Sequence, residues 1–167
     1  MTDDLLRLVA DRQEITILLH RYARGIDRCD EATLLSVWED GAQADYGSGW
    51  EDARAWCHGV LGRLHRMTAT MHALSNIIID VYGEEARAET YCQAYHLLAD
   101  HRRMIVGGRY LDELRHGPAG WKIARRRYVL DWNETEPSTA LFGEGPFARF
   151  TTVGGRYPDD PLYAIGD

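Results

Sequence analysis

The apolar residues change their spacing once along the chain, and this change separates a helical part from a strand-rich part. In residues 14–26 the large apolar side chains recur with the period of an α-helix: Ile15, Leu18, Leu19, Tyr22 and Ile26. This spacing predicts an amphipathic helix with one buried stripe. Asp30 is placed to cap a second helix that carries Trp38. A short strand at residues 42–46 and a third helix over residues 51–66 complete this part.

Around residue 69 the apolar period becomes two, which is typical of β-strands. The pattern predicts four consecutive strands, over residues 68–82, 86–99, 102–116 and 121–132. Gly107 and Gly108 interrupt the third strand and predict a bulge or a bend there. Helices followed by an antiparallel meander indicate an α+β fold, in which a strongly bent sheet wraps over the helices.

Strand alternation sorts the side chains of this predicted sheet into two faces. Three sets of residues, one from each of three strands, share a face in this way: His72, Leu74, Asn76 and Ile78; Cys92, Ala94, His96 and Leu98; Arg126, Tyr128 and Leu130. Several polar groups on an otherwise apolar concave face favour a pocket over a filled core.

His72 is a titratable ring in an otherwise apolar strand. It is either a hydrogen-bonded core histidine or a general base, and a base needs a carboxylate to orient it. Asp27 is the matching feature, near the end of the first helix and at the margin of its apolar stripe. It is either a solvated surface charge or a group that points into the mouth of the curved sheet. The residues alone leave both alternatives open.

Composition narrows the classes of partner. The 167 residues are enough for one domain with a hydrophobic core. A net charge of -7 argues against nucleic acid or an anionic membrane surface as the main partner, and no apolar run approaches the roughly 18 residues of a membrane span. Three cysteines without C-x-x-C spacing, and an acidic N-terminus without a secretory signal, predict a cytoplasmic location. Seven scattered histidines lack metal-binding spacing, so we expect no catalytic metal.

Four segments together resemble the SnoaL-like branch of the nuclear transport factor 2-like (NTF2-like) superfamily: LLHRYARGIDRCDEATLLSVWEDGAQADYG, MHALSNIIIDV, GGRYLDEL and GWKIARRRYVLDW. The resemblance covers about residues 5–133. We therefore expect one domain over residues 1–133, and a C-terminal extension over residues 134–167 that runs over the surface or contacts a neighbouring subunit. Within this branch the sequence is similar to scytalone dehydratase, bile acid 7α-dehydratase and hexachlorocyclohexane dehydrochlorinase.

These enzymes imply a cone-shaped α+β barrel of N-terminal helices packed into a strongly curved, mostly antiparallel sheet. They also imply a homo-oligomer, either a trimer or a dimer, and a His-Asp dyad that works without metal or organic cofactor. The dyad aspartate falls on Asp27 and the dyad histidine on His72. Two catalytic tyrosines fall on Tyr22 and Tyr46. The dehydrochlorinase has a lysine at the position of Tyr22, and this difference argues against simple dehydrohalogenation.

The predicted substrate-binding residues are Arg126, His96 and Asn76. The resemblance carries over an arginine of the last strand to Arg126 and a histidine of the middle sheet to His96, whereas Asn76 shares the predicted face of His72. Arg126 has an alternative role as a structural ion-pair partner, and Tyr22 has one as plain core packing.

The resemblance implies a cofactor-independent lyase of the dehydratase kind. His72 would abstract a proton next to a carbonyl, and water would leave from a small hydrophobic substrate that is ring-shaped or polycyclic. An isomerase or cyclase would use the same base but expel nothing. A non-catalytic subunit, like the small subunit of ring-hydroxylating dioxygenases, would have a filled cone and a large partner-binding face. A passive binder would have the pocket without the dyad geometry.

Overall fold

The computed structural model describes residues 2–142 and 144–165. These residues form three α-helices and six β-strands, followed by two short 3-10 helices. The order is α1 (Thr2–Arg28), α2 (Glu31–Ser36), β1 (Trp38–Asp45), β2 (Glu51–Asp52), α3 (Ala53–Leu64), β3 (Ala69–Tyr82), β4 (Glu85–Leu97), β5 (Arg102–Gly117), β6 (Gly120–Pro137), η1 (Gly145–Phe147) and η2 (Pro161–Ala164). None of the helices in this part of the chain is long and apolar enough to cross a membrane.

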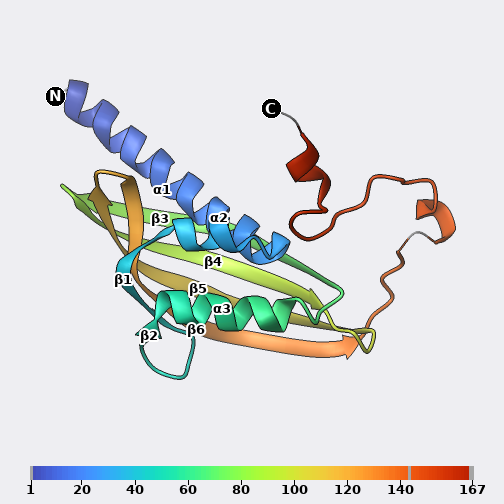
Figure 1. Ribbon diagram of the computed structural model, residues 1–167. Helices are drawn as coiled ribbons and strands as arrows, with labels where there is room; N and C mark the ends of the chain where they lie inside the picture. The colour runs from blue at the N-terminus through green and yellow to red at the C-terminus, as the bar shows by residue number, and fades with distance from the viewer. Residues whose placement is uncertain (1, 143, 166–167) are drawn as a thin grey trace.

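A single six-stranded sheet, in the order β2-β1-β6-β5-β4-β3, carries the fold. Neighbouring strands are antiparallel, except that β1 and β6 are parallel. The sheet curves strongly, and the three helices lie on its concave side (Figure 1). The structure confirms the predicted α+β class and the curved, mostly antiparallel sheet. The sheet keeps two edges, β2 and β3, and does not close into a barrel.

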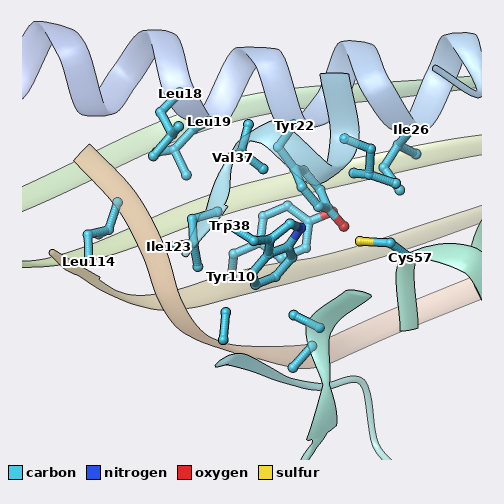
Figure 2. Close-up of a cluster of buried hydrophobic side chains, with 14 of the residues drawn as sticks. Leu18, Leu19, Tyr22, Ile26, Val37, Trp38, Cys57, Tyr110, Leu114 and Ile123 are labelled. Carbon is cyan, nitrogen blue, oxygen red and sulfur yellow. The ribbon is translucent and has the colours of Figure 1, made fainter. Parts of the chain in front are cut away.

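Helix α1 buries its predicted apolar stripe against the sheet. The stripe residues are all buried: Ile15, Leu18, Leu19, Tyr22 and Ile26. In Figure 2 Leu18, Leu19, Tyr22 and Ile26 face Trp38, Tyr110 and Ile123 on the strands. Burying each large apolar side chain contributes about 1.5–3 kcal/mol. A Cβ atom on Gly25 would lie 2.8 Å from the Cα atom of Leu34, so this glycine lets α2 pack directly on α1.

The second helix is shorter than predicted. Asp30 caps it as expected, because its side chain accepts a hydrogen bond of 3.0 Å from the backbone N–H of Thr33. The helix ends at Ser36, however, and Trp38 begins β1, where it pairs with Ile123 of β6. Assigning Trp38 to the helix is therefore wrong. Its apolar side chain is buried as a strand residue, and the helical period continued past the true end of α2 only by chance.

A bulge in β3 reverses the side-chain alternation of that strand. The pairing of β3 with β4 shifts between Ser75 and Ile78, and Asn76 adopts a left-handed backbone conformation with φ of 46°. Leu74 packs against the core before the bulge, whereas Ile77 and Ile79 do so after it. Grouping Asn76 and Ile78 with His72 is therefore wrong, because both residues lie in the part of the strand where the alternation no longer holds. Both are exposed.

The predicted bulge at Gly107 and Gly108 is confirmed. Gly107 pairs with Trp132, but Gly108 pairs with Leu130, so one residue of β6 is left out of the ladder. A Cβ atom on Gly108 would lie 2.4 Å from the hydroxyl of Tyr128, and one on Gly107 would lie 2.3 Å from the ring of Trp132. A Cβ atom on Gly108 would also lie 2.3 Å from the backbone carbonyl oxygen of Val129, so a larger residue at either position would collide with β6.

The last strand continues past the predicted domain boundary, because β6 ends at Pro137. Beyond it the chain leaves the sheet and returns to the C-terminal end of α1 (Figure 1). The backbone N–H of Tyr157 donates a hydrogen bond of 2.6 Å to the carbonyl of Arg28. The side chain of Arg28 forms an ion pair of 2.8 Å with Asp160. The C-terminal segment therefore contacts the helix that carries Asp27.

Candidate active site

Asp27 and His72, which are 45 residues apart, meet at the concave side of the sheet. Asp27 lies in the last turn of α1 and His72 near the start of β3. One carboxylate oxygen of Asp27 is 2.7 Å from Nδ1 of His72, and the other accepts a hydrogen bond of 2.8 Å from the backbone N–H of His72. A carboxylate that accepts both bonds fixes the position and the rotation of the ring.

The protonation of this pair follows from its contacts. Burial by itself raises the pKa of Asp27, but hydrogen bonds and charge from His72, together with the hydroxyl of Thr70, outweigh it and lower the pKa below 3.8. Asp27 is therefore an ionised acceptor at neutral pH, so Nδ1 of His72 donates. Nε2 of a neutral His72 is then a free base, and it makes no hydrogen bond to any residue that the structure describes.

A cavity of about 180 Å³ opens beside His72. Its walls come from α1, α3, the four long strands and Tyr46, which directly follows β1, and most of the lining is aromatic or aliphatic. The lining residues with polar atoms are Tyr22, Tyr46, Trp56, Arg63, His72, Cys92, His96, Tyr110 and Tyr128. The concave face therefore encloses a pocket, as the polar residues on it predicted.

Tyr22 and Tyr46 form a hydroxyl pair on the cavity wall. Their oxygens are 2.5 Å apart, and the ring of Tyr46 stacks on Trp56 with centroids 3.8 Å apart. Burial raises the pKa of both phenols, and the charge of Arg126 opposes this rise without cancelling it. Both residues therefore stay protonated at neutral pH, and one hydroxyl of the pair has a proton left to donate to a ligand.

His96 lies beside His72 in the same cavity. The two ring centroids are 5.4 Å apart and the rings are nearly perpendicular. Burial, followed by the charge of His72, lowers the pKa of His96 to about 4, so this ring is neutral at neutral pH. Its Nδ1 is buried and makes no hydrogen bond within the described chain. A neutral imidazole in this position can accept from or donate to a bound ligand.

Arg126 does not line the cavity, which argues against its predicted contact with substrate. The guanidinium is fully buried and forms two hydrogen bonds of 2.6 and 2.7 Å with Asp112. It lies between the rings of Tyr22 and Tyr110, at 4.1 and 4.0 Å from their centroids. Asp112 outweighs the effect of burial and raises the pKa of Arg126. These contacts favour the structural ion-pair alternative.

Asn76 is also absent from the cavity lining, because the bulge in β3 turns it to the exposed surface. This position argues against its predicted role in substrate binding. Sequence reasoning missed Tyr110 and Trp56, which form much of the aromatic wall. Period-two alternation from Gly108 could have placed Tyr110 inside, and the apolar face of the third helix contains Trp56. Among the described residues no group of three or more His, Cys, Asp and Glu could hold a metal ion.

Solved structures of several proteins share this fold. A hexachlorocyclohexane dehydrochlorinase of type 3 from Novosphingobium barchaimii has a TM-score of 0.72 and 18% identity, over 83% of this chain and 98% of its own. A scytalone dehydratase-like protein from Novosphingobium aromaticivorans has a TM-score of 0.69 and 22% identity, over 85% and 99%. A protein from the same organism described as an aromatic ring hydroxylase has a TM-score of 0.68 and 25% identity, over 77% and 94%.

A search of functionally curated proteins gives no match. The SnoaL-like domain family, by contrast, matches residues 7–127, which is most of the chain and runs from within α1 to the first part of β6. The chain belongs to the SnoaL-like family of the NTF2-like superfamily.

Proposed function

We propose that this protein is a cofactor-independent lyase that removes water from a small cyclic β-hydroxy ketone. The observation that carries the proposal is the contact of His72 with Asp27 at the edge of an aromatic cavity. A buried carboxylate on Nδ1 leaves Nε2 as the basic atom that faces the ligand. The similarity of the fold to a dehydrochlorinase and a dehydratase-like protein supports an elimination reaction over other uses of the same base.

In the first step, Nε2 of His72 takes the proton from the carbon next to the substrate carbonyl. The electron pair of that C–H bond moves into the carbonyl, and an enolate forms. Asp27 stabilises the imidazolium that results, because the two groups then carry opposite charges. The Tyr22–Tyr46 pair donates a hydrogen bond to the enolate oxygen, a contribution of about 3–4 kcal/mol for one well-placed donor.

In the second step, the enolate collapses and breaks the C–O bond to the β-hydroxyl group. The imidazolium of His72 returns its proton to the departing oxygen, so water leaves and an α,β-unsaturated ketone remains. The base is regenerated, and no electrons or atoms from a cofactor are needed. His96 is uncharged at neutral pH and orients the leaving hydroxyl group by a hydrogen bond.

The volume of the cavity limits the substrate. A dry protein cavity of about 150 Å³ holds a benzene molecule, and this cavity measures about 180 Å³. It therefore suits one ring or two fused rings, and a larger polycyclic ligand would extend beyond it. The ring of Tyr46 stacks on those of Trp56 and Tyr128, with centroids 3.8 and 5.6 Å apart, and the three rings form an aromatic wall suited to a cyclic ligand.

A β-hydroxytetralone tests the proposal, because loss of water converts it to a naphthol that is followed by absorbance. We expect turnover with the wild type, and a loss of about 10² or more for His72→Ala. His20→Ala removes an exposed histidine of α1 and should behave as wild type.

The same assay in D₂O separates the alternatives. Deuterium that enters the carbon next to the carbonyl without loss of water would favour an isomerase or cyclase. Binding with neither exchange nor water loss would favour a passive binder, and no binding at all would favour a non-catalytic subunit.

The proposal includes a homo-oligomer and a cytoplasmic location. Large apolar side chains are exposed on the strands at Met71, Ile78, Tyr91 and Leu111, which supports contacts between copies. The three cysteines are free and buried, which supports a reducing compartment. Light scattering coupled to gel filtration would test the assembly, and a monomer at micromolar concentration would contradict it.

A further inference from the structure

The C-terminal end of α1 carries Asp27 and depends on residues from the far end of the chain. The last four carbonyls of an α-helix have no partner within the helix. Here the turn that follows satisfies two of them: the backbone N–H groups of Cys29 and Asp30 donate to Ile26 and Gly25, at 3.2 and 2.9 Å. Cys29 has a φ of 50°, which is the left-handed geometry of a Schellman cap.

The C-terminal segment satisfies the remaining two carbonyls. The guanidinium of Arg156 donates to the carbonyl of Asp27, and the backbone N–H of Tyr157 donates to the carbonyl of Arg28 at 2.6 Å. Every carbonyl in the last turn of α1 therefore has a partner, and two of the four partners come from residues about 130 positions away. A cation at this end of a helix also offsets the negative end of the helix dipole.

Arg156 contacts two further elements at the same time. Its Nη1 atom donates to the hydroxyl of Thr70 at 2.7 Å, and its Nη2 atom donates to the carbonyl of Leu64 at 3.3 Å. Thr70 lies two residues before His72 on β3, and Leu64 is the last residue of α3. One planar, permanently charged group thus joins the helix of Asp27 to the strand of His72.

The neighbours of Arg156 hold it in this position. Asp160 accepts hydrogen bonds from Arg28 at 2.8 Å and from the backbone N–H of Gly155 at 2.7 Å. The hydroxyl of Tyr163 donates to Asp30 at 2.9 Å. These contacts fix the segment on both sides of Arg156, so the guanidinium is in place before any ligand binds.

We propose that Arg156 is a positioning residue for the His72–Asp27 pair, supplied by the C-terminal segment from outside the part of the chain that matches the family. It sets the distance between the end of α1 and the start of β3, and with it the 2.7 Å contact of Asp27 with Nδ1 of His72. This inference rests on the proposed function for its kinetic consequence only. Arg156 is not part of the cavity lining, so it acts through the pair and not on the ligand.

The test compares Arg156→Ala with Arg149→Ala in the full-length protein. Arg149 is an exposed arginine of the same segment and contacts the ring of Phe150, so its removal is a matched control. With β-hydroxytetralone we expect kcat to fall about 10- to 100-fold in Arg156→Ala, with little change in KM, because small displacements of catalytic groups have effects of this size. Free guanidinium, far below denaturing concentration, should restore part of the lost kcat.

A second readout does not need turnover. A proton held between Nδ1 of His72 and the carboxylate of Asp27 should give a downfield resonance in the proton NMR spectrum of the free protein. We expect this resonance in wild type and in Arg149→Ala, and its loss or broadening in Arg156→Ala. An unchanged resonance in Arg156→Ala would overturn the inference. If wild type binds but does not convert the ketone, the proposed function fails, and the resonance still decides the role of Arg156.

Arg156→Lys covers the case in which the alanine variant does not fold. Lysine keeps the charge but cannot reach three acceptors with one planar group. We expect a folded protein with a weakened resonance and a kcat between those of wild type and Arg156→Ala. A lysine variant with the wild-type resonance and kcat would show that the three hydrogen bonds of the Arg156 guanidinium have no positioning role.

Discussion

Two buried pairs of a basic and an acidic side chain lie on the concave side of the sheet, and they differ in what surrounds them. Asp27 and His72 meet at 2.7 Å, and each side chain keeps 10% of its accessible surface. Asp112 and Arg126 meet at 2.6 Å, and both side chains are 0% exposed. His72 borders the cavity, whereas aromatic rings cover Arg126.

This difference shows that a close ion pair is not by itself a site. A histidine can give up and take back a proton in the physiological range, whereas an arginine stays charged. The first pair has both a titratable ring and an atom that faces a cavity. The second pair has neither, and its charge acts only on the groups packed around it. We therefore expect that changes in the two pairs have opposite consequences for stability and for activity.

The largest effect is expected at the fully buried Asp112–Arg126 pair. Arg126→Met leaves the carboxylate of Asp112 buried without its partner, which lowers the free energy of unfolding by about 3–5 kcal/mol. Urea unfolding measures this loss. The double variant Arg126→Met/Asp112→Leu removes both charges and should recover most of it. A loss below about 1 kcal/mol in the single variant would mean that water reaches Asp112, and the comparison would then fail.

The Asp27–His72 pair, which borders the cavity, should show the reverse pattern: a large loss of activity and a small loss of stability. Asp27→Asn removes the charge that stabilises the imidazolium, so turnover of β-hydroxytetralone should fall about 10²- to 10³-fold. The unfolding free energy at neutral pH should fall by only about 1–2 kcal/mol, because the amide keeps one acceptor oxygen. Since the pKa of Asp27 is lowered, its stabilising contribution is complete above about pH 4 and is lost as the pH falls through the folded pKa.

Steady-state kinetics and urea unfolding of the Asp27→Asn variant, side by side with Arg126→Met, check this contrast. An asparagine variant that keeps wild-type turnover would remove the chemical distinction between the two pairs. Equal losses of unfolding free energy in the two variants would mean that the two pairs do not differ in their contribution to stability.

A third effect concerns His96, the neutral ring beside the Asp27–His72 pair. Its pKa is lowered from 6.5 to about 4, so the unfolded chain takes up a proton in this range before the folded protein does. The contribution of His96 to stability is therefore complete above pH 6.5 and is lost progressively as the pH falls to 4. The loss amounts to about 3 kcal/mol at 1.36 kcal/mol per pH unit.

His96→Phe removes this titration while it keeps a ring of similar size. Urea unfolding between pH 7 and pH 4 should show a smaller decrease in stability for the variant than for wild type. Parallel curves for the two proteins would mean that the ring gains a proton in the folded state, and His96 would then belong with the charged groups of the cavity.

Much of the fold and the central pair could be predicted from the sequence because they depend on local patterns. The helical period identified α1, period-two alternation identified β3 to β6, and the resemblance pointed to Asp27 and His72. The predicted carboxylate and ring lie in contact because both flank well-defined apolar stripes. Patterns of this kind can be recognised in the sequence without knowing which residues of neighbouring strands pair.

The ion pair of Arg126 with Asp112 is a feature that such local patterns do not predict. Counting back from the turn between β5 and β6, where Gly117 pairs with Gly120, places Asp112 opposite Arg125. The pairing shifts between Glu113 and Leu114, so Asp112 lies opposite Arg126 instead. This one-residue shift decides which acidic side chain lies opposite Arg126, whose inward direction the alternation already predicted. No spacing in the sequence marks this shift, and none marks the contact of Arg156 with α1.

Asn76 is the site of the smallest expected effect, and it lies where the predicted alternation of β3 failed. Its φ of 46° lies in the left-handed region, which asparagine tolerates and a β-branched residue does not. Asn76→Val should lower the unfolding free energy by about 1–2 kcal/mol in thermal or urea unfolding. Asn76→Gly should stay within about 0.5 kcal/mol of wild type and keep its activity, because residue 76 is exposed and lies outside the cavity. A glycine variant with a raised KM would return Asn76 to the substrate-binding set, and a harmless valine would mean that β3 runs straight past His72 without the bulge.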